Sequence, residues 1–134
     1  MKLIGLAIHA FIIWLVCGLT IALGRGILDL ETALWVHAAV APTVAALVSL
    51  FYFRRSPATT PFRAAVFFLL FVVILDAALV APVFERSYAM FSSFLGTWLP
   101  FASIFLATYI TGTSASGRRR RANGRPPAAL RNRI

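Results

Sequence analysis

The sequence has little charge, few acidic residues and almost no cysteine. Of its 134 residues, 13% are charged and only four are acidic, whereas soluble domains carry about 25% charged residues. Cys17 is the only cysteine, so the chain has no internal disulfide and no cysteine-based metal site. These shortages exclude a small disulfide-stabilised domain and argue against a soluble one.

The sequence also lacks the motifs of common enzyme chemistry. It has no GxSxG elbow, with which many hydrolases present a nucleophilic serine. A zinc site needs three or four close ligands, and the only histidines are His9 and His37. We expect these two to differ in depth by about 12 Å in a membrane, too far to hold one haem iron. The sequence therefore predicts no catalytic residue, no metal ion and no cofactor.

Apolar residues make up 60% of the chain, compared with about 45–50% in globular proteins. A helix needs about 20 mostly apolar residues to cross a bilayer. These runs predict an all-α polytopic membrane protein with four transmembrane helices in an antiparallel up-down bundle, residues 1–112. The first run is longer than a typical signal-peptide core, so we expect it to be retained. The four runs lie at 3–23, 32–53, 62–84 and 88–111.

Turn-forming residues predict where the helices begin, end and bend. Gly24 and Gly26 are expected to end the first helix. Thr60 before Pro61 predicts a side-chain cap followed by a proline at the first position of the third helix. Pro100 lies near the middle of the fourth run and predicts a kink there.

The fourth run has two distinct faces at the helical angle of about 100° per residue. Small and hydroxyl residues favour helix contacts in a membrane, and bulky apolar residues can face lipid. We expect the first face to point inward and the second outward. The inward residues are Ser92, Gly96, Pro100, Ser103 and Ala107, and the outward ones are Phe94, Trp98, Phe101, Phe105 and Tyr109.

Cations are unevenly divided between the ends of these runs. Only Arg25 and Arg86 lie at one set of ends, together with three of the four acids. Because positively charged segments stay in the cytoplasm, we expect a multi-pass protein of a bacterial cytoplasmic (inner) membrane with both termini in the cytoplasm. The eleven cations of the other set are Lys2, Arg54, Arg55, Arg63, Arg118, Arg119, Arg120, Arg121, Arg125, Arg131 and Arg133.

The third run carries a carboxylate among apolar residues, Asp76 within AAVFFLLFVVILDAALVAP, residues 64–82. The helical rise places Asp76 about 22 Å from the cytoplasmic side and His37 about 9 Å from the other side. In a core about 30 Å thick the two lie at one level, together with Ser92 and Ser93. Since a charged group costs about 2.5–3.5 kcal/mol there, it needs a partner. We predict that Asp76 pairs with His37 and that Ser92 or Ser93 completes the hydrogen bonds.

Two roles are open for this intramembrane polar site. Asp76 either fixes the register of the helices as a hydrogen-bonded group or, with His37, carries protons or ions. A secondary polar site is predicted nearer the cytoplasmic side, where His9, Ser49 and Ser103 reach a similar level.

The tail from Thr113 onward ends in GRRRRANGRPPAALRNRI. Its charge and turn-forming residues predict a disordered cytoplasmic segment over 113–134. We expect its arginines to anchor the chain on the anionic headgroups of the lipid bilayer. No nucleic-acid-binding motif accompanies them, so no specific nucleic acid is expected as a partner. The anchor residues are Arg118, Arg119, Arg120 and Arg121.

The stretches VHAAVAP, TTPFRAAVFF and FSSFLGTWLPFASIFLATYITG give the chain a likeness to known proteins. Over residues 1–112 it resembles small, uncharacterised four-helix membrane proteins of bacteria. The resemblance implies four helices and carries no functional residue.

The sequence leaves three functions open. The first is a non-enzymatic interaction or auxiliary membrane subunit that packs against copies of itself or a larger partner. The second is a small oligomeric transporter or channel that uses Asp76 and His37. A more distant third is an intramembrane enzyme acting on a lipophilic substrate.

Overall fold

A computed structural model describes residues 2–56 and 58–124, and within these ranges the chain is helical with no strand. It has four helical stretches that are long and apolar enough to cross a membrane. This confirms the prediction of an all-helical chain with four such helices. The elements are α1 (Lys2–Ile27), α2 (Leu30–Arg55), α3 (Pro61–Leu75), the π-helical η1 (Asp76–Glu85), the 3-10 turn η2 (Ala89–Ser92), the π-helical η3 (Phe94–Trp98) and α4 (Leu99–Asn123).

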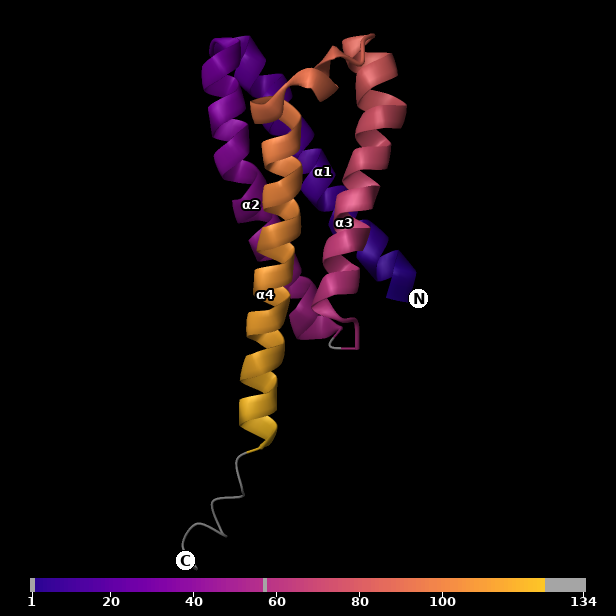
Figure 1. Ribbon diagram of the computed structural model, residues 1–134, viewed down its shortest axis with the longest axis vertical. Helices are drawn as coiled ribbons and strands as arrows, with labels where there is room; N and C mark the ends of the chain where they lie inside the picture. Colours follow the sequence, from indigo (N-terminus) through magenta and orange to yellow (C-terminus); the bar gives the residue numbers. More distant parts are fainter. Residues whose placement is uncertain (1, 57, 125–134) are drawn as a thin grey trace, which may run out of the picture.

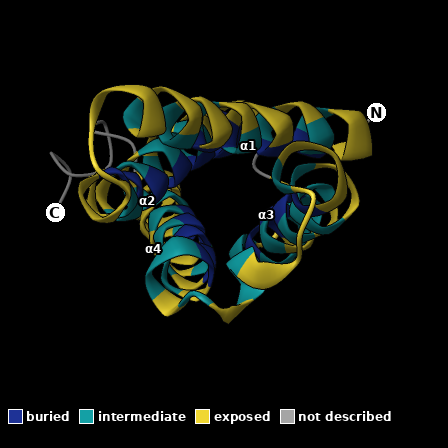
Figure 2. Ribbon diagram, turned by 90° about the horizontal axis from the view of Figure 1, so that it is seen from above, coloured by how far each residue is buried: buried dark blue, intermediate teal, exposed yellow. Residues whose placement is uncertain are grey.

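The helices are arranged so that α1 and α4 each pack against both α2 and α3. Seen from above, the buried residues line the inner sides of the helices and the exposed ones face outward (Figure 2). The α1–α2 turn and η2 lie at the upper end, and the α2–α3 connector lies toward the lower end (Figure 1). At the upper end Arg25 forms an ion pair with Glu85, which joins the end of α1 to the end of η1.

Two helices begin at side-chain caps, of which the sequence analysis predicted the one at Thr60. Thr60 accepts a hydrogen bond from the backbone N–H of Arg63, and Pro61 follows as the first residue of α3, which confirms that prediction. Asp29 caps α2, where it accepts bonds from the backbone N–H and the hydroxyl of Thr32 at 2.9 and 2.7 Å. These side chains satisfy backbone donors that have no partner within the helix.

The cap at Asp29 is sensitive to acid. The hydrogen bonds from Thr32, first from its backbone N–H and then from its hydroxyl, lower the pKa of Asp29 below its ordinary value of 3.8. A carboxyl with a lowered pKa in the folded state stabilises that state above its unfolded pKa. This contribution is lost as the pH falls through the lowered value.

The first helix passes through Gly24 instead of ending there. α1 continues to Ile27, and only two residues separate it from α2. A Cβ atom at Gly24 would lie 3.0 Å from the Cβ of Ala33 in α2. The prediction that Gly24 ends the helix was therefore wrong, because this glycine serves the close approach of two helices.

The fourth stretch begins at Phe94 instead of residue 88, and Pro100 does not kink its middle. Pro100 is at the start of α4, directly after the wide turns of η3. Pro82 similarly lies inside the wide turns of η1. A proline has no N–H to donate and its ring collides with the carbonyl four residues earlier. Wider helical turns next to each proline are consistent with this constraint.

The inward face of η3 and α4 also differs from the predicted one. It consists of Thr97 in η3 and of Pro100, Phe101, Ile104, Thr108 and Gly112 in α4. Phe101, predicted to face outward, is buried, whereas Phe94, Trp98 and Tyr109 are exposed as predicted. The contact face thus includes hydroxyl, aliphatic and aromatic side chains. The positions of the smallest side chains alone are therefore not sufficient to predict it.

The helix α4 extends well into the segment that was predicted to be disordered. It runs to Asn123, so residues 113–123 are helical. In Figure 1 this part of α4 projects below the other helices. The rest of the predicted tail, 125–134, lies outside the described residues.

A close contact lies at Gly112, where α4 meets α2 and the start of α3. A Cβ atom at this position would lie 2.7 Å from two ring carbons of Phe53 and 2.8 Å from the Cβ of Pro61. Phe62 and Phe105, with ring centroids 6.1 Å apart, hold α3 against α4 nearby. A side chain at Gly112 would therefore force the Phe53 ring and Pro61 to shift.

We therefore expect Gly112→Ala to lower the free energy of unfolding by about 1–3 kcal/mol, because the methyl group overpacks the junction. Thermal unfolding in detergent, followed by helical circular dichroism, measures the effect. Gly117→Ala is the matched control, because a Cβ there meets no atom within 4 Å. Equal melting temperatures for the two variants would show that the contact at Gly112 does not limit the packing.

Candidate functional site

The buried carboxylate of Asp76 is bound by a tryptophan. The indole N–H of Trp14 in α1 donates to Oδ1 of Asp76 with an N···O distance of 2.9 Å. Both side chains are half-buried, and Asp76 is the first residue of the π-helical η1. This bond joins the middle of α1 to the point where α3 changes its helical pitch.

His37 lies apart from this pair. It is 8% exposed on the inward face of α2, and its Nδ1 has no hydrogen-bond partner within the described part of the chain. The predicted pair of Asp76 and His37 is not formed, because neither a hydrogen bond nor an ion pair joins the two side chains within the described residues.

Ser92 and Ser93 do not complete the site at Asp76 either. Ser92 ends the turn η2 and donates to the carbonyl of Ala89 at 2.6 Å. Ser93 caps η3 by accepting from the N–H of Gly96 at 3.0 Å. Both belong to the connector before the fourth helix, so the prediction that they lie within that helix was wrong.

The predicted secondary polar site is divided in the same way. His9 donates through Nδ1 to the carbonyl of Gly5, and its ring packs edge-on against Tyr52. Ser49 donates to Oγ1 of Thr108 at 3.1 Å, in a buried bond between α2 and α4. Ser103 donates to the carbonyl of Pro100 in its own helix. The three side chains each have a separate partner and do not form one site.

Trp14 is the partner of Asp76 that the sequence analysis missed. The helical rise from Lys2 places it about 18 Å along α1, close to the depth predicted for Asp76. A buried indole N–H needs an acceptor, and Asp76 is the only acidic residue within the apolar runs. The similar expected depth of Trp14 and Asp76, together with the need of the indole N–H for an acceptor, could therefore have predicted this pair.

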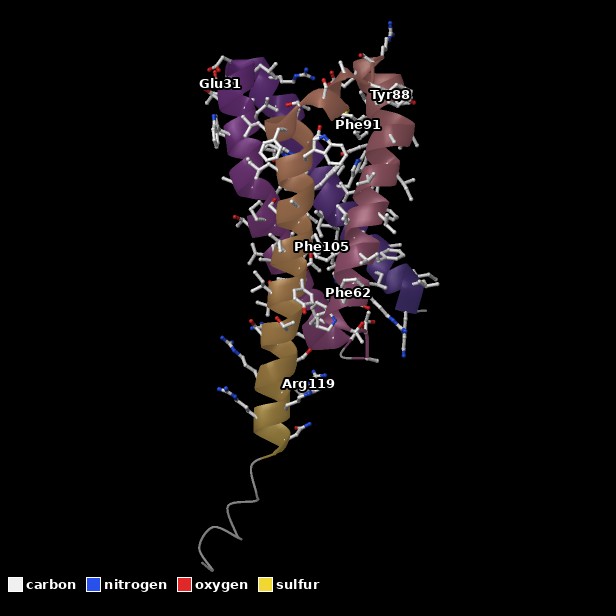
Figure 3. All side chains as sticks on the ribbon, viewed as in Figure 1. Glu31, Phe62, Tyr88, Phe91, Phe105 and Arg119 are labelled. Carbon is white, nitrogen blue, oxygen red and sulfur yellow. The ribbon has the colours of Figure 1, made fainter. Side chains whose placement is uncertain are left out.

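A second polar region lies at the lower end of the molecule, where a groove of about 990 Å³ separates the end of α2, the α2–α3 connector and the lower part of α4. We call it the basic groove. Its lining includes Arg54 together with three of the four predicted anchor residues, Arg118, Arg119 and Arg120. Figure 3 labels Arg119 on the projecting part of α4 and Glu31 at the opposite end of the molecule. The anchor arginines thus contribute to a shaped cavity, which the sequence analysis did not foresee.

No protein-family model matches this chain, and no curated protein and no solved structure does either. Its site is therefore interpreted from its own geometry.

The bond between Trp14 and Asp76 predicts how much each substitution at these two positions lowers the free energy of unfolding. Trp14→Phe removes the donor and is expected to cost about 1–2 kcal/mol, in the range of interhelical hydrogen bonds in membranes. Asp76→Asn keeps an acceptor oxygen for the indole, so its cost should stay below about 0.5 kcal/mol. In the double variant the cost of Trp14→Phe should shrink when Asp76 is replaced by Leu. Purely additive effects in thermal unfolding would contradict the bond.

Replacement of His37, unlike that of Trp14, is not expected to lower the stability of the bundle. A buried nitrogen without a partner costs about 1–3 kcal/mol, so His37→Leu should leave stability unchanged or raise it. The measurement is again thermal unfolding in detergent, with Ser49→Ala as the comparison because it breaks the bond to Thr108. A marked loss of stability in His37→Leu alone would show that His37 has an essential partner.

Proposed function

We propose that the chain is a multi-pass integral protein of a bacterial cytoplasmic membrane, with its four helices alternating up and down. The support is the charge pattern on a scaffold of four sufficiently long apolar helices. Arg54, Arg55 and the arginines of α4 lie toward one end, and Asp29 and Glu31 begin α2 at the other. By the positive-inside rule the arginine-bearing end, and with it both termini, belongs in the cytoplasm.

Within that membrane we propose that the protein is a non-enzymatic subunit that binds another transmembrane helix through α1. The observation that carries this proposal is an exposed face of small residues, Gly18, Ala22 and Gly26, at four-residue spacing. A Cβ atom at Gly18 or at Gly26 would meet no atom within 4 Å. We call these three residues the α1 small face.

Gly18 needs an explanation from outside the chain. A glycine inside a helix costs about 0.5–1 kcal/mol relative to alanine. At Gly24 and Gly112 close contacts with Ala33 and Phe53 explain the glycine. At Gly18 no described residue makes such a contact, although the position lies within the apolar part of α1.

A second transmembrane helix is the contact that this face fits. In lipid, association depends on van der Waals packing, and small residues spaced four apart let two backbones approach closely. The bulky residues around the face, Leu15, Leu19 and Leu23, are 42%, 51% and 63% exposed and can pack around the partner. The partner is either a second copy of this chain or a larger membrane protein.

The transporter alternative has weaker support. It required Asp76 and His37 to act together, and no hydrogen bond joins them within the described residues, where Asp76 is bound by Trp14 instead. A hydrogen-bonded clamp between α1 and α3 accounts for Asp76 without a moving ion. If Asp76 carried protons instead, Asp76→Asn would abolish ion-dependent flux in vesicles while leaving the fold intact.

The interaction proposal predicts that Gly18→Leu and Ala22→Leu weaken association by about five- to thirty-fold, since the lost packing corresponds to about 1–2 kcal/mol. Energy transfer between two labelled pools of the protein in vesicles measures self-association, and the yield of co-purification in mild detergent measures a larger partner. Ala102→Leu is the matched control, because it adds the same side chain at an exposed position of α4.

The proposal fails if the α1 variants and the α4 control change association equally. It also fails if neither readout detects any association of the wild-type protein. Self-association in vesicles without a co-purified partner would identify the second copy as the occupant of the α1 small face.

A further inference from the structure

The basic groove combines two kinds of surface. Leu50, Phe53 and Ile110 form an apolar section of its lining, and Ile110 is 59% exposed. Beyond Gly112 on α4 the lining becomes cationic, with Arg118 and Arg119. The groove therefore has an apolar section next to a positively charged section, and α4 contributes to both.

These two sections match the depth profile of a membrane surface. The helical rise places Arg118 and Arg119 about 9–11 Å beyond Gly112, whose neighbours Phe53 and Pro61 mark the last tightly packed level of three helices. The headgroup layer adds about 5–8 Å on each side of the hydrocarbon core. Arginine side chains bridge the remaining distance because they bend toward the interface.

The acidic side chains lie elsewhere in the molecule. Asp29 and Glu31 are at the start of α2, opposite Arg54 at its end, Glu85 ends η1, and Asp76 is bound to Trp14. Within the described residues, Arg54 and the α4 arginines therefore share one groove that no acidic side chain lines. Thr60 and Pro61, at the start of α3, also line the groove, so the positive end of that helix dipole adds to the field.

We propose that the basic groove binds one anionic phospholipid. Its phosphate lies among Arg54, Arg118 and Arg119, and its acyl chains run along Leu50 and Ile110 into the membrane. A free phosphate would use only the cationic wall and would leave most of the 990 Å³ volume and the apolar wall unoccupied. This inference rests on the membrane insertion proposed above and is independent of the α1 small face.

The arginines divide into two groups that the sequence alone does not distinguish. Arg54 lines the groove and its neighbour Arg55 does not; Arg119 lines it and Arg121 does not. A diffuse attraction to a negative surface would use all four alike. A built site uses Arg54 and Arg119, so the double variants Arg54→Gln/Arg119→Gln and Arg55→Gln/Arg121→Gln form a matched pair of equal charge.

The test titrates phosphatidylglycerol into the purified full chain in a neutral detergent and follows the bound lipid by native mass spectrometry. We expect one lipid to bind to the wild-type protein and to Arg55→Gln/Arg121→Gln with similar affinity. In Arg54→Gln/Arg119→Gln the affinity should fall about tenfold or more, given about 1 kcal/mol per cation near a headgroup. Phosphatidylcholine should bind weakly to all three proteins.

Three results would overturn the proposal. Equal losses in the two double variants would indicate diffuse surface charge, and equal binding of phosphatidylcholine would remove the role of the net negative charge. Full competition by millimolar inorganic phosphate would assign the groove to a free anion. Arg54→Lys/Arg119→Lys, which keeps both charges, controls for misfolding and should retain more affinity than the glutamine pair.

Failure here is distinguishable from failure of the proposed function. The groove variants should leave association through the α1 small face unchanged, and Gly18→Leu should leave lipid binding unchanged. Loss of both properties in either variant would instead indicate a general disturbance of the bundle.

Discussion

The close approach of three helices at Gly112 is the constraint on which the lower half of the molecule depends. A glycine there lets Phe53 of α2 and Pro61 of α3 contact the backbone of α4. Because lipid gives helices no hydrophobic reason to associate, such van der Waals contact between small and large residues replaces the driving force available in water. The same contact determines where α4 leaves the other helices, and so where the basic groove opens.

Polar side chains reinforce this packing in separate pairs. Trp14 with Asp76 joins α1 to α3, and Ser49 with Thr108 joins α2 to α4. At the upper end Arg25 with Glu85 joins α1 to η1. Two of these pairs hold α1 against the two ends of η1, and the third holds α2 against α4, so separate bonds set the register of the two contacts. This arrangement suits a scaffold more than a relay, which needs neighbouring groups in one continuous row.

The sequence was sufficient for the number of long apolar helices and for the cap at Thr60, because these follow from length, composition and local turn chemistry. It was insufficient to predict the direction in which each side chain points around its helix axis. We expected Asp76 to pair with His37, yet no hydrogen bond joins them within the described residues, and Trp14 was overlooked as the donor to Asp76. The wide turns beside Pro82 and Pro100 break the regular angle on which such directions are counted. Charge likewise predicted disorder after Thr113, although a helix that already exists extends at little cost through residues with adequate helix propensity.

That extension gives the run of four arginines a meaning that a disordered tail would not have. A flexible segment presents all its charges to the membrane on average, so its arginines are interchangeable. A helix continuous with α4 holds each side chain at a fixed angle, and Arg118, Arg119 and Arg120 line the basic groove while Arg121 does not. The same rigid connection transmits the packing at Gly112 to the position of Arg119 relative to Arg54. The geometry of a lipid site at the surface is thereby coupled to the contact between helices inside the bundle.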